Sequence, residues 1–228
     1  MYSFKEDGTL RGFQKFIADV YGQTDDRLYS IWDLLVQEQR FAMRSLKGIR
    51  KGDTDKIKIN LLITFSWLMA ISNRLHIDIE DEVWNRFPGL CSYCGEKPCA
   101  CRKIKPSERL KIKPDKSKKP RNLESLQDMF ENIYPSKSRT LADAGVHFAE
   151  EVGEVSEAVH NYLGQHISSQ FDEIKLEMAD LVSCSFGIAN SAKIDVAKEL
   201  AAMFHDNCHV CHNAPCDCSF SNVISVKS

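Results

Sequence analysis

The chain repeats itself, and this internal duplication constrains its fold more than any other feature of the sequence. Residues 91–101 read CSYCGEKPCAC and residues 208–218 read CHVCHNAPCDC, so one spacing of four cysteines recurs at an offset of 117 positions. Flanking positions align at the same offset, as Phe87 does with Phe204, and near the start of the chain the offset is 113. A long repeat of this kind indicates two copies of one folded unit.

Each copy shows the apolar spacing of helices. In the first copy Leu10, Phe13, Ile17 and Val20 recur at intervals of three or four residues, and no segment alternates as a strand would. The sequence therefore predicts an all-α fold, a tandem duplicated helical bundle with four helices in each half. After the first helix, the expected helices span residues 28–46, 56–74, 79–87, 123–133, 141–163, 171–191 and 195–204.

The predicted domain organisation follows from the two copies and the segment between them. We expect a first repeat over 1–101, a basic linker over 102–121 and a second repeat over 122–228, with a cysteine cluster at the end of each repeat. The linker segment holds ten Lys or Arg residues and two acidic residues, whereas the whole chain has a formal net charge of −2. Its prolines and its shortage of large apolar residues are typical of an extended, solvated linker.

Nucleic acid and membranes are disfavoured as partners. Basic segments attract nucleic acid, but this linker carries no aromatic side chains that could stack on bases. The longest apolar run, Leu61–Ile71, is about half as long as a membrane span requires. The first ten residues, MYSFKEDGTL, lack the apolar core of a signal peptide. We therefore expect a cytoplasmic protein with no membrane partner.

Two acidic pairs in the second copy form the strongest functional pattern. Glu151 and Glu154 lie within EEVGEVSEAV, and Glu177 and Asp180 lie within LEMADLV. Since three residues make almost one helical turn, the members of each pair project from one face of a helix. Apolar neighbours place both pairs beside a buried face, where the like charges repel one another unless a cation binds between them. Carboxylate oxygens favour Mg²⁺ or Mn²⁺ over zinc.

The first copy lacks all of these carboxylates, which argues against the commoner interpretation of an acidic helix face as solvated surface. At the aligned positions it has Leu34, Gln37, Asn60 and Ile63. Surface residues would be expected to differ in a scattered way between the copies. A complete replacement by apolar and amide residues indicates one working site and one scaffold copy.

The segments HFAEEVGEVSEAV and LEMADLV resemble the paired ExxE and ExxD motifs of the all-α nucleoside triphosphate pyrophosphohydrolases, the MazG and dimeric dUTPase superfamily. The resemblance spans about residues 123–204, and the first half shares it only through the duplication. It implies Mg²⁺-dependent or Mn²⁺-dependent hydrolysis of a nucleoside or deoxynucleoside triphosphate to the monophosphate and pyrophosphate. It also implies that Glu151, Glu154, Glu177 and Asp180 are the metal ligands of a catalytic site.

The same resemblance implies an assembly. Members of the family work as dimers or tetramers whose sites lie between bundles. The degenerate first half would then supply the second wall of the site, and we expect a homodimer of the duplicated chain.

Other residues near the motifs are candidates for proton transfer and substrate binding. Glu150 stands beside the first acidic pair and can accept the proton of an attacking water. His147 and Lys175 are candidates for contact with a phosphate, although helix packing and a solvated lysine are ordinary alternatives. Asn190 is a third substrate-binding candidate, and the first copy also has Asn at the aligned position, which suits a structural role equally well.

Eight of the nine cysteines fall into two clusters and predict two further metal sites. Four thiols within eleven residues of an intracellular protein favour a metal over disulfides. A tetrahedral Zn²⁺ site with a structural role is the simplest outcome, and an iron–sulfur cluster is the lesser alternative. Histidines lie near the second cluster only, so cysteines alone are expected to bind. The predicted ligands are Cys91, Cys94, Cys99 and Cys101 in the first repeat and Cys208, Cys211, Cys216 and Cys218 in the second.

Two other functions stand beside the hydrolysis of triphosphates. In the first, the bundle binds a nucleotide without turnover, and the zinc knuckles with the basic linker contact nucleic acid or a protein. In the second, the enzyme hydrolyses a related substrate, such as phosphoribosyl-ATP or a guanosine tetraphosphate alarmone. The intact carboxylates of the second half favour an enzyme over a binding module.

Overall fold

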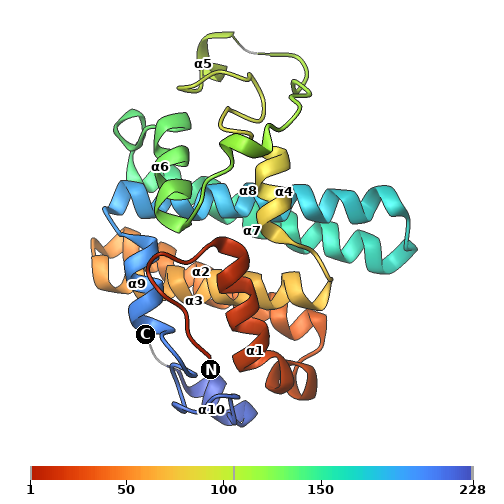
Figure 1. Cartoon of the computed structure of the whole chain (residues 1–228), viewed down its shortest axis with the longest axis vertical. Helices are drawn as coiled ribbons and strands as arrows, with labels where there is room; N and C mark the ends of the chain where they lie inside the picture. The colour runs from red at the N-terminus through yellow and green to blue at the C-terminus, as the bar shows by residue number, and fades with distance from the viewer. Residues whose placement is uncertain (1, 105, 227–228) are drawn as a thin grey trace. The chain divides into compact units, whose positions relative to one another are not determined.

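The computed structural model describes residues 2–104 and 106–226, and this part of the chain is all-helical, without a strand (Figure 1). The predicted all-α class is therefore confirmed. The chain divides into two compact units: unit 1 comprises Met1–Ile79 together with Ile194–Ser228, and unit 2 comprises Glu80–Lys193. None of the described helices is long and apolar enough to cross a membrane.

Unit 1 is built on a hairpin of two long helices, α2 (Ile31–Lys51) and α3 (Thr54–Arg74), with α1 (Leu10–Leu28) packed on α3. Two short helices near the end of the chain, α9 (Val196–Met203) and α10 (Phe220–Ser225), complete the unit. Helix α3 ends as predicted at Arg74, whereas α2 begins three residues after and ends five residues after the predicted span of 28–46.

Capping residues set the ends of the hairpin in unit 1. Ser30 and Asp33 form a reciprocal capping box at the start of α2. Gly52 ends α2 in the left-handed conformation, with a φ of 65° that glycine adopts without steric cost. Asp53 then accepts a hydrogen bond from the amide of Lys56 and starts α3. The turn between the helices is therefore encoded locally.

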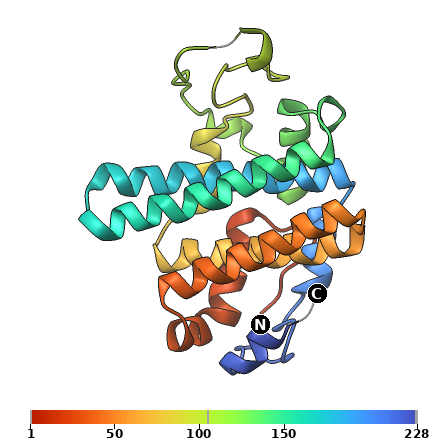
Figure 2. The same cartoon turned by 180° about the vertical axis from the view of Figure 1, so that it is seen from behind.

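Unit 2 contains a longer hairpin, α7 (Leu141–Gln165) and α8 (Ser168–Ala192), whose helices run side by side in Figures 1 and 2. Helices α4 (Ile79–Arg86) and α6 (Leu123–Ile133) lie on one side of this pair (Figure 1). The unit also holds three short helical turns, α5 (Cys101–Ile104), η1 (Lys116–Lys118) and η2 (Ser136–Ser138).

The boundaries of the compact units differ from the predicted domain boundaries at residues 101 and 122. They fall at Ile79 and Lys193, just before the fourth helix of each predicted repeat. Helix α4 and the first cysteine cluster therefore belong to the unit of α6, α7 and α8, whereas α9 and the second cluster belong to the unit of α1, α2 and α3. The fourth helix and the cysteine cluster of each predicted repeat are thus exchanged between the two units. Apolar periodicity does not reveal this exchange, because the same contacts form whichever copy supplies the fourth helix.

Matching contacts inside the two units are consistent with this exchange. In unit 1 the amide of Cys216 donates a hydrogen bond of 2.7 Å to the carbonyl of Val20. In unit 2 the amide of Cys99 donates one of 2.8 Å to the carbonyl of Ile133. Both donors and both acceptors are aligned by the repeat offsets, so each cluster occupies the same place in a unit formed mainly by the other copy.

Aromatic packing repeats in the same way. Phe204, which follows α9, meets Tyr21 of α1 with ring centroids 6.3 Å apart. Phe87, which follows α4, meets Tyr134 with centroids 6.2 Å apart. These positions also correspond under the predicted repeat offsets of 117 and 113.

The segment predicted to be a free basic linker is anchored within unit 2. The amide of Leu110 donates to the carbonyl of Tyr93, and the guanidinium of Arg109 lies over the ring of that tyrosine. Lys119 forms ion pairs with Glu80 at 3.0 Å and with Asp81 at 2.7 Å. The acidic first turn of α4 and the first cysteine cluster thus hold part of a segment whose composition alone suggested free solvation.

Glu38 on α2 is a buried acid in unit 1. Its side chain is 0% exposed, and neither carboxylate oxygen has a hydrogen-bond partner among the described residues. Burial raises the pKa of Glu38 to about 8, because the charged form loses its hydration. The protonated carboxyl group therefore predominates in the folded protein at neutral pH.

We expect Glu38→Gln to stabilise the protein at alkaline pH. Because the folded pKa lies above the unfolded value of about 4.3, the stability that depends on protonated Glu38 is complete below the unfolded pKa and is lost as the pH rises toward 8. The variant should exceed the wild type in free energy of unfolding at pH 8 but not at pH 4. Urea unfolding followed by circular dichroism measures this, with Glu6→Gln, an exposed acid of unit 1, as the control. An equal effect at both pH values would contradict the prediction.

The unit boundaries predict which fragments fold. The fragment 80–193 contains all of unit 2 and should unfold cooperatively in thermal melts. The fragment 122–228 matches the predicted second repeat, but it lacks α4 and the first cysteine cluster. It also contains α9 without α1, α2 and α3, the helices of the unit to which α9 belongs. It should therefore aggregate or unfold without a sharp transition. The reverse result would show that the sequence repeats, rather than the compact units, are the folding units.

Candidate functional site

Three carboxylates meet between α7 and α8 in unit 2. Glu151 comes from α7, whereas Glu177 and Asp180 come from α8, and one oxygen from each lies within 4.8 Å of the others. The spacing of three residues puts both α8 carboxylates on the side that faces α7. This group, called the carboxylate triad below, has the composition and compactness of a divalent-cation site.

Burial and mutual repulsion destabilise the charged forms of the triad carboxylates. Burial raises the pKa of Glu151 to about 8, and the neighbouring charges of Asp180, Glu154 and Glu177 contribute to that rise. Burial likewise raises the pKa of Glu177 to about 7, with additional repulsion from Asp180 and Glu154. A cation bound between these groups would relieve both the burial of charge and the repulsion.

Two arginines neutralise part of this charge. Arg86, the last residue of α4, donates from Nε and Nη2 to the two oxygens of Asp180 at 3.0 and 2.5 Å. Both side chains of this pair are 10% exposed. Arg109 lies 3.5 Å from the same carboxylate and is 45% exposed. Burial raises the pKa of Asp180, and the charge of Arg86 opposes that rise.

Arg86 was not identified from the sequence, because it lies in the first repeat. One signal was present: Arg86 aligns with Met203, just as Asp180 aligns with Ile63. Both members of the ion pair are thus replaced by apolar residues in the other copy. Such a paired change indicates contact between the two positions, and hence exchange of the fourth helix.

The remaining acidic candidates lie at the edge of the triad. Glu154 is exposed and is not one of the three converging groups, although its charge raises the pKa of Glu151 and Glu177. Glu150 is also exposed. Oε2 of Glu151 is buried without a hydrogen-bond partner among the described residues, so the site has an acceptor that a cation can satisfy.

The predicted substrate-binding residues are engaged elsewhere or exposed. Lys175 forms a 2.8 Å ion pair with Asp172 of its own helix. The side chain of Asn190 accepts a 2.9 Å hydrogen bond from Gln127 and donates to its carbonyl, which gives it a structural contact. His147 is exposed on α7.

Arg139 is a further basic residue near the triad that the sequence patterns did not single out. A side chain at Gly187 of α8 would come within 3.0 Å of its guanidinium, so the glycine leaves room for it. Nη2 donates to the carbonyl of Tyr134, whereas the buried Nε has no partner among the described residues. Burial and the charge of Glu151 raise the pKa of Cys184, and the charge of Arg139 opposes that rise.

Each cysteine cluster brings its four sulfur atoms within 4.8 Å of one another. In the first cluster Sγ of Cys91 lies 3.7 Å from that of Cys101. In the second, Sγ of Cys208 lies 3.8 Å from that of Cys218 and 3.5 Å from that of Cys216. A tetrahedron with metal–sulfur bonds of about 2.3 Å has sulfur–sulfur edges of about 3.8 Å. Both clusters can therefore hold a tetrahedral metal ion.

Hydrogen bonds to sulfur support the same interpretation. Backbone amides approach Cys94 Sγ and Cys208 Sγ at 3.4 Å, and the hydroxyl of Tyr134 donates to Cys91 Sγ at 3.4 Å. His209 instead faces the hydroxyl of Tyr21 at 3.0 Å. The sulfurs of Cys91, Cys94 and Cys208 thus accept hydrogen bonds, and His209 has a partner outside the cluster.

Comparison with known proteins adds no assignment. No protein-family model matches the chain, and neither the curated proteins nor the solved structures give a significant match. The functional argument therefore depends on the triad, its arginines and the two cysteine clusters.

Loss of one cluster should loosen the unit in which it lies rather than the repeat that encodes it. We expect Cys91→Ser to speed hydrogen exchange in α6, α7 and α8 while α1, α2 and α3 keep their protection, since metal binding is coupled to folding. Cys208→Ser should do the reverse. Hydrogen-exchange mass spectrometry measures both, with Cys184→Ser as a control outside the clusters. Faster exchange confined to α1, α2 and α3 in Cys91→Ser would contradict the exchanged arrangement.

Proposed function

We propose that the protein is a Mg²⁺-dependent nucleotide pyrophosphohydrolase that converts a nucleoside or deoxynucleoside triphosphate to the monophosphate and pyrophosphate. The observation that carries the proposal is the carboxylate triad, with Arg86 and Arg109 against Asp180. Converging acids bind metal, and adjacent arginines bind phosphate. Ligands for the metal and cations for the phosphates of a metal–triphosphate complex therefore lie next to each other.

Glu151, Glu177 and Asp180 would hold Mg²⁺ or Mn²⁺. The buried oxygen of Glu151, which has no partner among the described residues, and the raised pKa values of Glu151 and Glu177 both fit a bound cation. When bound, Mg²⁺ neutralises phosphate charge and lowers the pKa of a coordinated water. Glu154 would join the ligands if its side chain turned toward them, and its charge already raises the pKa of Glu151 and Glu177.

The arginines and the outer carboxylates would serve the substrate. Arg86 holds Asp180 in a fixed orientation through two hydrogen bonds, and the more exposed Arg109 can turn toward a phosphate. Glu150 is exposed beside the triad and would accept the proton of the attacking water. These roles assign the chemistry to unit 2 and give unit 1 no part in hydrolysis.

The two cysteine clusters would each hold a structural Zn²⁺. Both are closed sets of four sulfurs, with no position left for a substrate. Their place against helices of the same unit suits a folding role. We also propose a homodimer of the chain, as the motif resemblance implies.

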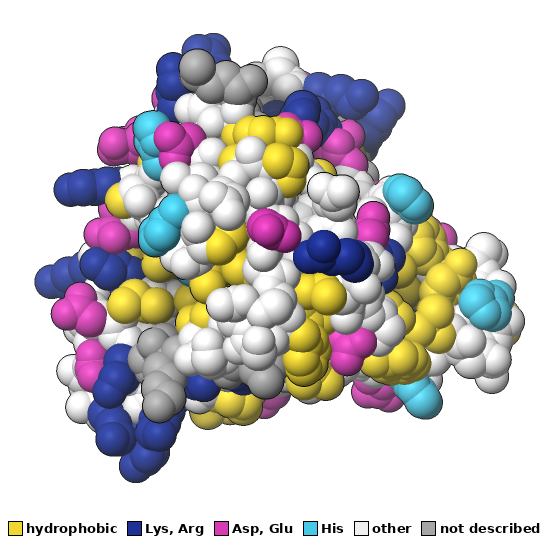
Figure 3. All heavy atoms as spheres, turned by 90° about the horizontal axis from the view of Figure 1, so that it is seen from below, with side chains coloured by type: hydrophobic (Ala, Val, Ile, Leu, Met, Phe, Trp, Pro, Cys, Tyr) yellow, Lys and Arg dark blue, Asp and Glu magenta, His cyan; other side chains and the backbone are white. Residues whose placement is uncertain are grey.

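A second candidate is nucleotide binding without turnover. The bidentate pair of Arg86 with Asp180 favours it, because a metal must compete with a guanidinium for one of its ligands. A nucleic-acid partner has less support: Lys119 is paired with acids of α4, and basic, acidic and apolar side chains are interspersed over the face in Figure 3.

Hydrolysis should require the triad. With a panel of NTPs and dNTPs, Glu151→Gln and Asp180→Asn should each lower the rate of pyrophosphate release by roughly a hundredfold or more, because a ligand of the metal is lost. Glu157→Gln on α7 is the matched control and should keep the wild-type rate. Chelation of the metal should stop the reaction, and Mn²⁺ should restore it. Full activity of both triad variants would exclude the site, whereas nucleotide binding without release would support the second candidate.

A further inference from the structure

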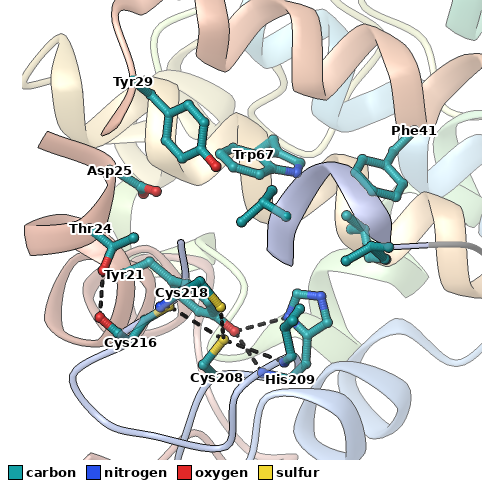
Figure 4. A pocket seen from close by; sticks show the side chains of 14 residues that line it. Tyr21, Thr24, Asp25, Tyr29, Phe41, Trp67, Cys208, His209, Cys216 and Cys218 are labelled. Atoms are coloured by element: carbon teal, nitrogen blue, oxygen red, sulfur yellow. Dashed lines mark hydrogen bonds between the residues drawn. The ribbon is translucent and has the colours of Figure 1, made fainter. Parts of the chain in front are cut away.

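Unit 1 encloses a second candidate site, in a cavity of about 40 Å³ (Figure 4). Its walls come from α1, α2 and α3, from the second cysteine cluster and from the region of α10. Four aromatic side chains dominate the lining: Tyr21, Tyr29, Phe41 and Trp67. The rings of Tyr29 and Trp67 meet edge to face, with centroids 5.5 Å apart.

Two buried polar groups in this cavity have no partner among the described residues. Asp25 is 8% exposed, and its carboxylate forms no hydrogen bond or ion pair with any described residue. Tyr29 is 4% exposed, and its hydroxyl is likewise without a hydrogen-bond partner in the part of the chain that the structure describes. Figure 4 shows both groups directed toward the space in front of Trp67. Buried polar groups are nearly always satisfied in proteins, so two orphans in one cavity point to a ligand.

The nearby arginines are engaged with other groups. Arg74 donates to the backbone carbonyls of Asp25 and Tyr29 and pairs with the carboxylate of Asp26 at 3.0 Å. Arg40 donates to the carbonyl of Val226 at 3.2 Å, and Arg44 does so at 2.9 Å. The latter two arginines hold the end of the described chain beside the cavity. The charge of Arg74 acts on the Asp25 carboxylate, although no described cation lies within ion-pair distance of it.

Of the three positions that align with the carboxylate triad, which are Leu34, Asn60 and Ile63, only Ile63 lines the cavity. Ile63 and Trp67, which line the cavity, align with Asp180 and Cys184. At these two positions unit 1 has an aliphatic residue in place of Asp180 and an aromatic residue in place of Cys184. Asp25 supplies a negative charge from α1 instead.

We propose that this cavity binds a small alkylammonium ion. A carboxylate in an aromatic enclosure attracts an organic cation through charge and through the faces of the rings. The small volume suits a compact head group such as a methylated ammonium. The hydroxyl of Tyr29 can accept a hydrogen bond from an N–H of the ion. Both Asp25 and Tyr29 would then have a polar partner.

The test uses the full-length protein with methylammonium and tetramethylammonium chloride as probes. Titrations are followed through the indole N–H resonance of Trp67, with tert-butanol as the neutral probe of similar size. We expect saturable shifts with at least one cation and none with tert-butanol. Asp25→Asn should weaken binding by about tenfold or more, because one charge is removed from a buried site.

Asp26→Asn is the matched control, since Asp26 is the neighbouring acid and its side chain is 76% exposed. It should bind the cation like the wild type. Trp67→Leu and Tyr29→Phe should also weaken binding, and circular dichroism confirms that each variant is folded. The proposal is overturned if neither cation binds, if tert-butanol binds equally well, or if Asp26→Asn weakens binding as much as Asp25→Asn. Failure here would leave the hydrolase proposal intact, because the two sites share no residue.

Discussion

The attachment of each cysteine cluster to a helix of the other copy is the interaction on which both units depend. The amides of Cys216 and Cys99 donate to the carbonyls of Val20 and Ile133. A cluster of this size buries little apolar surface, so a metal ion bound to the four sulfurs would supply much of its rigidity. Because α4 precedes the first cluster directly, the same attachment carries Arg86 to Asp180. The electrostatics of the candidate catalytic site thus depend on a cysteine cluster that contributes no atom to it.

The parts of the structure that depend on local signals could be predicted from the sequence. Helix α6 spans the predicted residues, and capping boxes explain where α2 and α7 begin. Glu151, Glu177 and Asp180 converge because spacing on a helix fixes the face to which a side chain points. Glu154 follows the same rule, yet it remains exposed, since sequence spacing does not determine how closely two helices approach each other.

The parts that depend on chain connectivity could not be predicted in this way. Two copies of one unit offer identical contacts to the fourth helix of either copy, so periodicity leaves the exchange undetermined. Arg86 was missed for this reason, although its replacement by Met203 in the other copy pointed to it. Asp25 was missed for another reason: a single acid near the end of an amphipathic helix resembles ordinary surface unless the aromatic rings that surround it are taken into account.

The boundaries of the units also set an order of completion during synthesis. Unit 2 is one continuous stretch, Glu80–Lys193, and is finished while the ribosome is still translating the remainder of the chain. Helices α1, α2 and α3 are made first, but the ring of Phe204 that covers Phe13 arrives more than a hundred residues later. Domains generally fold as they are synthesised. Unit 2 is therefore an insertion within unit 1, and the core formed by α1, α2 and α3 stays incomplete until Phe204 has been made.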